Sequence, residues 1–199
     1  YGALGANTTA HDNTAFGHAA LNANTTANGN VGVGASALTA NTGQSNTAVG
    51  SNAAAANTTA NYQVAVGANA LAATTTGGSN TALGMDALAA NTTGWSNVAV
   101  GRDALSHNTT SEKSVAVGQN ALRENTGGQF GVAVGHDALQ QNTTGDGNTA
   151  VGAYCLDANT TGLENTALGY NSLTDTVSGS RNVAVGKNAL MDCTVSGNT

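Results

Sequence analysis

The side chains that could do chemistry are few in this chain, and their spacing limits what they could do. Four histidines, two cysteines and 11 acidic residues occur among 199 residues. His18 and His136 share one place in a repeated unit but lie seven units apart. In stacked β-structure that separation is about 34 Å, which excludes a shared metal ion. We therefore expect His11, His18, His107 and His136 to be solvent-exposed, and predict no metal site.

Three aspartates recur at one place, the second residue after a repeated glycine, where other units carry asparagine. These are Asp86, Asp103 and Asp137. Asp86 and Asp103 lie in adjacent units, so their oxygens could bridge a calcium ion. The reading that we favour is a column of turn-forming Asp and Asn side chains. No Ser-His-Asp spacing, phosphate-binding loop or paired-carboxylate pattern stands out, so we predict no catalytic residues and no cofactor, and that the chain is not an enzyme.

The two cysteines, Cys155 and Cys193, occupy different places in units just over two repeats apart. The height difference alone is about 10 Å, and a disulfide needs Cα atoms within roughly 7 Å. We expect two free thiols within one chain. A disulfide between two chains stays open as an alternative.

Composition excludes several classes of protein. Alanine, glycine, asparagine and threonine number 38, 27, 26 and 29, while charged residues make up 8% against roughly 25% in an ordinary domain. A net charge of −6 with five Lys and Arg argues against a nucleic-acid partner. The chain has no run of about 18 apolar residues, so we expect no membrane insertion of this segment, and no signal segment is visible.

Glycine recurs at every seventeenth position, and one interval, from Gly34 to Gly50, is a residue shorter. A unit reads N-[TV]-A-[VL]-G-x-x-A-L-x-x-N-T-T-G-x-x. The recurring glycines are Gly17, Gly34, Gly50, Gly67, Gly84, Gly101, Gly118, Gly135, Gly152, Gly169 and Gly186.

This period predicts an all-β fold, a parallel β-solenoid (β-roll) of 17-residue coils. Helical-pair repeats need about 30 residues or more. In this chain, by contrast, β-branched residues alternate before each glycine, as in 97–101. We expect residues 1–199 to form a single repeat array of about twelve units without a linker. Because the units at both ends are partial, we expect a fragment of a longer repetitive chain.

Two ladders of apolar residues are expected to fill the coil. One is the residue before each glycine, such as Val100 or Val117, and the other is the leucine four residues after the glycine, such as Leu105. The mid-strand alanines, such as Ala116, would then face outward. Because alanine is a poor strand residue, we predict that they form a second packed face against another chain. The alternative is a plain surface of small residues.

Asparagine recurs at the strand start and before Thr-Thr, as in Asn97 and Asn108. Stacked asparagines can bond amide to amide along a column, as in cross-β assemblies, or can cap turns. We expect a structural role.

Asn-Thr-Thr also matches the N-glycosylation pattern, which matters only on a eukaryotic secretory route. The matches are Asn7, Asn24, Asn57, Asn91, Asn108, Asn142 and Asn159.

The strand motif SVAVG-x-x-A, residues 114–121, resembles the head repeats of trimeric autotransporter adhesins. Those repeats carry a Ser-Val-Ala-Ile-Gly-like strand in each coil of a left-handed parallel β-roll, although their unit is shorter than the one in this chain. NTAVG-x-x-A-L-x-x-NTTG is also similar to repeats of bacteriophage tail fibres and large bacterial surface proteins. No functional residue carries over, because the matching positions are structural.

The resemblance implies a structural or adhesive extracellular fibre, a rigid stalk or head on a cell surface or virion. It implies self-association as a homotrimer or filament, and a cell-surface or glycan receptor as a possible partner. Two alternative functions belong to other classes of protein. One is an enzyme such as a polysaccharide lyase. Such an enzyme would need long loops that carry acid, base or metal groups, and no insertion in this chain exceeds the repeat period.

The other alternative is an ice-binding β-solenoid that uses the threonine ladder. Ice-binding faces are expected to use two threonine ranks that alternate in a strand, whereas adjacent threonines point to opposite faces. The ladder is Thr8, Thr25, Thr42, Thr58, Thr75, Thr92, Thr109, Thr126, Thr143 and Thr160.

Overall fold

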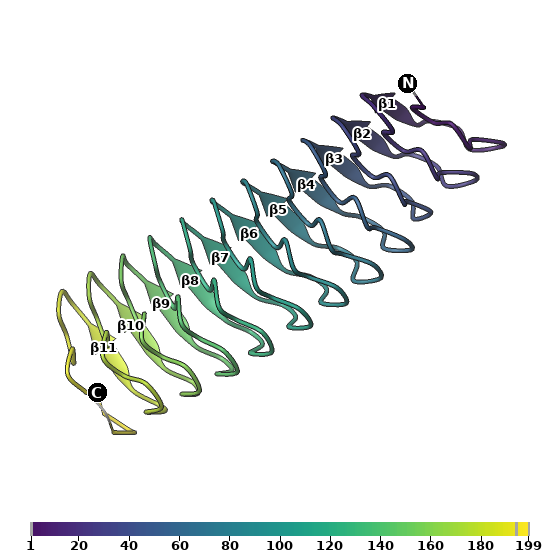
Figure 1. Ribbon diagram of the computed structural model, residues 1–199. Coiled ribbons are helices and arrows are strands. Elements are labelled where there is room, and N and C mark those ends of the chain that lie inside the picture. Colours follow the sequence, from purple (N-terminus) through teal and green to yellow (C-terminus); the bar gives the residue numbers. More distant parts are fainter. Residues whose placement is uncertain (1, 194, 199) are drawn as a thin grey trace.

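The computed structural model describes residues 2–193 and 195–198, and confirms the parallel β-solenoid. Eleven short strands form one parallel sheet in chain order, each coil contributing one strand (Figure 1). No helix occurs within the described residues. The strands are β1 (Thr14–Phe16), β2 (Val31–Val33), β3 (Thr47–Val49), β4 (Val64–Val66), β5 (Thr81–Leu83), β6 (Val98–Val100), β7 (Val115–Val117), β8 (Val132–Val134), β9 (Thr149–Val151), β10 (Thr166–Leu168) and β11 (Val183–Val185).

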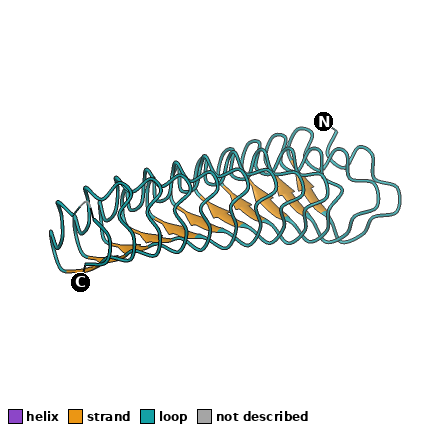
Figure 2. Ribbon diagram, turned by 90° about the horizontal axis from the view of Figure 1, so that it is seen from below, coloured by secondary structure: helices purple, strands orange, loops and turns teal. Residues whose placement is uncertain are grey.

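The strands stack in register to make one long side of the molecule, which we call the strand wall (Figure 2). Most neighbours pair one full repeat apart, as Val98 does with Val115. The short unit lies between β2 and β3, where Val31 pairs with Thr47. Its missing residue comes from the loop, because Asn41 precedes one threonine instead of two. The sheet therefore keeps its register when a residue is lost outside the strand.

The segment from each repeated glycine to the asparagine seven residues later forms the opposite side, which we call the turn wall. In the coil of 84–91 it consists of successive turns, with the Ala89 N–H donating to Asp86 O (3.3 Å) and the Asn91 N–H to Leu88 O (3.1 Å). Asp86 and Leu88 have φ angles of 57° and 52°. A left-handed conformation costs about 1–2 kcal/mol per residue with a side chain. Burial of Leu88 and its N–H bond to the next coil offset that cost.

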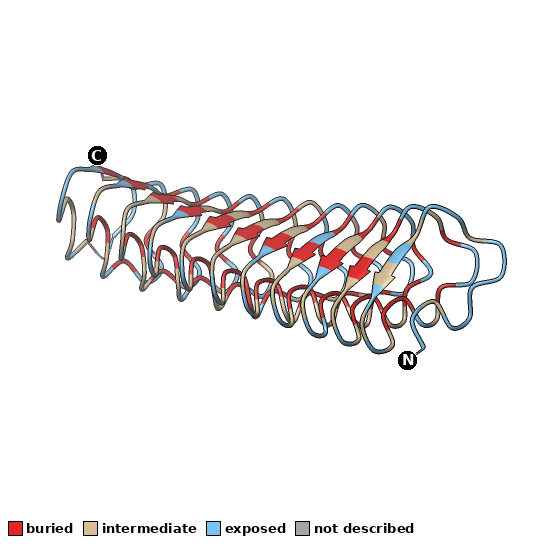
Figure 3. Ribbon diagram, turned by 90° about the horizontal axis from the view of Figure 1, so that it is seen from above, coloured by how far each residue is buried: buried red, intermediate tan, exposed pale blue. Residues whose placement is uncertain are grey.

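The middle residue of each strand faces the core, so the predicted orientation of the strands was wrong. Ala99 and Ala116 are fully buried, whereas the flanking Val100 and Val117 are partly exposed (Figure 3). The alanines that were predicted to pack against another chain instead pack inside their own. The leucine ladder is buried as expected, with Leu105 fully enclosed.

The width of the coil explains this orientation. The leucine side chains reach across from the turn wall to the strand wall, and only small residues fit opposite them. Gly32 replaces alanine in β2, and a Cβ placed on it would lie 3.2 Å from Leu21 Cγ. A valine at such a position would collide with leucine, so the bulkier strand residues must point outward.

Buried asparagine columns join the coils, as predicted. Before Thr-Thr, Asn142 Nδ2 donates to Asn125 Oδ1 (2.9 Å), and Asn159 Nδ2 donates to Asn142 Oδ1 (2.8 Å). At the strand start, the Asn97 N–H donates to Asn80 Oδ1 (2.9 Å). These bonds satisfy polar groups that burial would otherwise make costly.

Asparagine is replaced three times in the first of these columns, by Thr74, Thr176 and Cys193. Thr74 and Thr176 take the place of asparagine and cannot offer the amide donor. The oxygen of the asparagine one coil earlier, Asn57 Oδ1 or Asn159 Oδ1, is buried and has no hydrogen-bond partner within the described residues. The column is therefore weaker at these two steps, and also at the step from Asn24 to Asn41, where Asn24 Oδ1 has no partner among the described residues.

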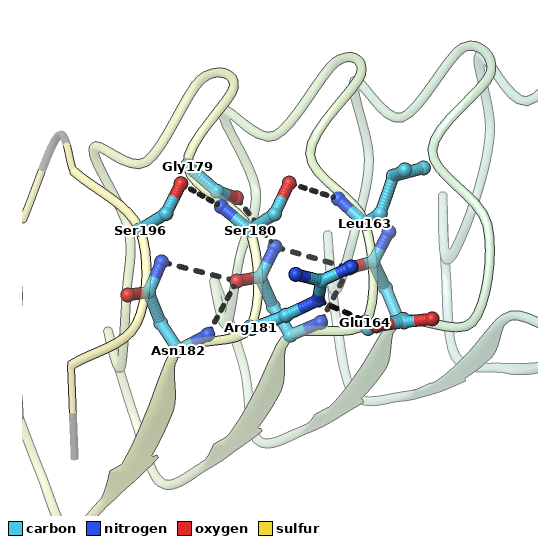
Figure 4. A network of polar contacts seen from close by, with 9 residues as sticks. Leu163, Glu164, Gly179, Ser180, Arg181, Asn182 and Ser196 are labelled. Carbon is cyan, nitrogen blue, oxygen red and sulfur yellow. Dashed lines mark hydrogen bonds and ion pairs between the residues drawn. The ribbon is translucent and has the colours of Figure 1, made fainter.

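A further polar ladder lies at the corner before the strand wall (Figure 4). The Leu163 N–H donates to Ser180 Oγ (2.9 Å), and the Ser180 N–H donates to Ser196 Oγ (3.0 Å). Beside them, Arg181 Nε lies 3.0 Å from Glu164 Oε2 in the preceding coil. Exposed side chains thus link neighbouring coils at the surface as well as in the core.

Candidate functional site

The outward side of the strand wall is an uncharged surface, which we call the outer strand face. It consists of the first and last residue of every strand, and all of these are valine, threonine, leucine or phenylalanine. Several are well exposed, including Leu83 at 47%, Leu168 at 48% and Val185 at 67%. Sequence reasoning missed this face because it placed the valines inside the coil.

The turn wall carries the second candidate, a hollow of about 360 Å3 that we call the flank hollow. Asp86 and Asp103 border it from two adjacent coils, and Arg123 borders it from the next coil. His107 also lines it, while Ala89 and Ala90 supply methyl groups. Acidic and basic groups therefore share one cavity with a small apolar surface.

Charged and polar partners hold the groups around the flank hollow in place. Asp86 Oδ1 accepts a hydrogen bond from Asn69 Nδ2 (3.0 Å), and Asp103 Oδ2 lies 3.2 Å from the Nε of Arg102. Glu124 lies between two basic side chains of the same wall: it contacts His107 Nδ1 at 2.7 Å and Arg123 Nη1 at 3.3 Å. Each carboxylate keeps further lone pairs free to accept hydrogen bonds from a ligand.

A step in side-chain size creates the flank hollow. The fifth and sixth residues after each glycine are alanines in three successive coils, 55–56, 72–73 and 89–90, and then become Ser106–His107 and Arg123–Glu124. Long side chains thus stand beside a strip of methyl groups. This size change is the sequence signal that could have located the hollow.

Ser106 is the one buried polar group of the flank hollow whose side chain is unsatisfied. The residue is 6% exposed, and its Oγ has no hydrogen-bond partner among the residues that the structure describes. Since Ser106 and His107 line the same cavity, and Glu124 contacts His107, a serine nucleophile is worth testing geometrically. A nucleophile needs its base within hydrogen-bond reach, and no bond joins Ser106 Oγ to the imidazole.

The aspartates predicted as a possible calcium site, Asp86 and Asp103, both border the flank hollow. Within residues 2–193 and 195–198, however, no three His, Cys, Asp or Glu side chains come together in a way that could hold a metal ion. Asp137 lies elsewhere in the same column, where its Oδ1 accepts a hydrogen bond from Asn120 Nδ2 (2.8 Å). Three pairs of this column bond from coil to coil: Asn52 with Asn69, Asn69 with Asp86, and Asn120 with Asp137.

The histidines lie at the surface, as expected. His11 and His18 are exposed, and the side chains of His107 and His136 are 48% and 44% exposed.

The most perturbed carboxyl group is Asp157, on the turn wall. Burial raises its pKa above the usual value, and the carboxylates of nearby aspartates add to this rise.

Both cysteines are free thiols, Cys155 buried and Cys193 partly exposed. Burial raises the pKa of the Cys155 thiol to about 11, and the charge of Asp157 adds to the rise. The thiol donates to Ala167 O at 3.3 Å. Cys155 occupies a place that most units give to alanine, so Cys155→Ala is a conservative probe.

We expect Cys155 to resist iodoacetamide at pH 8 in the folded protein, while Cys193 reacts. The reason is that alkylation needs an accessible thiolate, and Cys155 offers neither access nor the charged form. Mass spectrometry of tryptic peptides checks this. Rapid labelling of Cys155 without unfolding would contradict its burial.

The same thiol predicts a pH dependence of stability. Below pH 9 the thiol is neutral in both the folded and the unfolded chain. Above pH 9 only the unfolded chain ionises, so the free energy of unfolding falls until the folded thiol also ionises near pH 11. The expected loss is about 3 kcal/mol over this range. Urea titrations of Cys155→Ala should not show this fall in the free energy of unfolding. If the free energy of unfolding falls equally with pH in both proteins, the prediction is refuted.

The glycosylation patterns lie mostly in the core. Asn24, Asn57, Asn91, Asn108, Asn142 and Asn159 are buried, and only Asn7 is exposed. The threonine ladder is at the surface, but its hydroxyls, except that of Thr25, bond to the next coil, as Thr92 Oγ1 does to Thr109 O (3.0 Å). These threonines therefore already use their hydroxyl donors within the stack.

The fold defines the chain as a β-solenoid repeat protein with two surface features, the outer strand face and the flank hollow. Comparison with known protein families, curated proteins and solved structures found no match. Among the described residues, none belongs to a helix long and apolar enough to cross a lipid bilayer. The function is therefore inferred from the geometry of these two surfaces.

Proposed function

We propose that the chain is a structural and adhesive fibre segment, in which copies of the solenoid associate through the outer strand face as a rigid extracellular stalk or head. The observation that carries this proposal is the absence of any charged residue from that face along all eleven described strands. Of the 22 residues of this face, 17 are valine, leucine or phenylalanine and five are threonine. Monomeric soluble proteins rarely expose large contiguous apolar patches.

A second copy of the chain is the partner that fits this face best. The face repeats its residues at the spacing of the coils, and another copy offers the same spacing along its whole length. A charged partner would gain nothing from a surface without charges, while the net charge of −6 lies elsewhere on the molecule. Three copies around a common axis would enclose the three faces, which gives the homotrimer that we propose.

Light scattering on the purified chain tests the proposal, and three times the mass of one chain is the expected result. Val100→Lys combined with Val117→Lys should lower this to the mass of one chain, because paired charges would be buried in the interface. Circular dichroism should stay unchanged, since both valines point away from the core.

Gln140→Lys is the matched control for these variants. Gln140 lies on the turn wall, in a column that carries Arg123 one coil earlier, so a cation is accepted there. Its mass should equal that of the parent chain. A monodisperse monomer of the parent chain would refute the proposal, and so would full association of the double lysine variant.

The ice-binding alternative stays a prediction. Its ladder threonines donate their hydroxyls to neighbouring carbonyls, so the geometry favours the fibre. Freezing-point hysteresis measured on the purified chain tests it directly.

A further inference from the structure

We propose that the flank hollow binds one saccharide unit of a glycan. This inference rests on the proposed function, because it assigns a ligand class to the adhesive fibre. The hollow measures about 360 Å3, which lies in the range of small-molecule sites. It lies on the turn wall, on the other side of the core from the outer strand face, and so stays open when that face is covered.

The mixed charge of the hollow points to a neutral polyhydroxylated ligand. Asp86 and Asp103 accept hydrogen bonds, and Arg123 donates them. Sugar hydroxyl groups both donate and accept, so one ring can satisfy both kinds of partner. A simple cation would meet the guanidinium of Arg123, and a simple anion would meet two carboxylates.

The remaining groups fit a sugar ring as well. The methyl groups of Ala89 and Ala90 offer an apolar patch for the C–H side of the ring. Ser106 contributes a hydroxyl that is buried and unpartnered within the described residues. An unsatisfied buried hydroxyl costs free energy, and a ligand hydroxyl that bonds to it would recover that cost.

The strip of small residues beside the hollow makes room for a longer glycan. Residues 55–56 and 72–73 are alanines at the same two places of the preceding coils. A chain of sugars attached to the bound unit can run along this strip without meeting long side chains. The site is thus the end of a shallow track along the fibre axis.

Saturation-transfer NMR with the methyl glycosides of glucose, galactose, mannose and N-acetylglucosamine tests the inference on the full chain. At least one glycoside should bind. Asp103→Asn and Arg123→Ala should each weaken its binding about tenfold or more, because each removes a charged hydrogen-bond partner. Both substitutions introduce the residue that other coils carry at the same place, so the fold is retained.

Asp137→Asn is the control, since it makes the same change in the same column but outside the hollow. It should leave the affinity unchanged. Absence of binding by all four glycosides would overturn the inference, as would binding that survives both hollow variants. Binding of glycine in the same experiment, or of calcium chloride measured by titration calorimetry, lost in Asp103→Asn, would assign the hollow to a zwitterion or a cation and overturn it too.

Light scattering on the same samples separates the two proposals. Full association without saccharide binding refutes the ligand class alone. Saccharide binding by a monomeric chain supports the hollow and refutes the fibre.

Discussion

Replacing Ala116 with aspartate should abolish folding of the array. Ala116 is the fully buried middle residue of β7, and the space opposite such a position is filled by a leucine side chain. Aspartate there would bury a charge without a partner and would also overfill the coil. Either effect costs several kcal/mol, which is a large part of the stability of an ordinary domain. Circular dichroism and thermal unfolding should show a largely unfolded chain.

Val117→Asp is the matched control for this prediction. Val117 is the adjacent residue, it points outward, and it belongs to the outer strand face. The variant should keep its circular dichroism spectrum while losing self-association. A folded Ala116→Asp chain beside an unfolded Val117→Asp chain would show that the strands face the other way.

Replacing Gly101 with alanine should destabilise the protein by about 3–5 kcal/mol. Gly101 has a φ angle of 130°, which side chains rarely allow. A Cβ at Gly101 would also lie 2.6 Å from the carbonyl oxygen of Gly118, the equivalent residue one coil later. Because backbone atoms cannot rotate away, neighbouring coils would have to separate. Urea unfolding should show a large shift of the midpoint.

Gly127→Ala provides the comparison for that substitution. A Cβ at Gly127 meets only Thr144 Cγ2, at 4.0 Å, and other units carry threonine at the same place. Alanine there should be neutral or should stabilise the fold by up to about 1 kcal/mol. Equal effects of the two substitutions would show that stacking does not depend on the glycine column.

Most of the fold could be predicted from the repeat period. Gly101 and Gly118 mark equivalent places in successive coils, and the residues between them contain one strand, one leucine and two asparagine positions. From this spacing the parallel stack, the buried leucine ladder and the asparagine columns could be predicted. The structure adds that the leucine sits at a left-handed turn, as Leu105 does with a φ of 51°, which no residue preference would suggest.

The direction of the strands could not be predicted from the alternation of Val100 and Ala99 alone. Alternation separates two faces but does not say which one is inside. Hydrophobicity favoured valine on the side of the strand that faces the core, while the narrow width of the coil favoured alanine there. That width is set by Leu105 and its equivalents reaching across from the turn wall, a property of the folded coil.

The candidate site was predictable only in part. Asp86 and Asp103 could be seen to share a column, but Arg123, which borders the same hollow, lies in a different column of a later coil. The hollow forms because long side chains of one coil stand beside short side chains of the adjacent coils, which becomes visible only in the folded stack. The outer strand face became visible once the strands were correctly oriented.

The missing links in the asparagine column have a mechanical consequence. Strands lie across the long axis, so a pull along that axis loads the bonds between coils one layer after another. Each coil touches only its neighbours, and the layer with the fewest amide links yields first. A tethered molecule under tension would therefore part first at the steps after Asn24, Asn57 and Asn159, where the column lacks its link, lengthening in stages and absorbing work at each one.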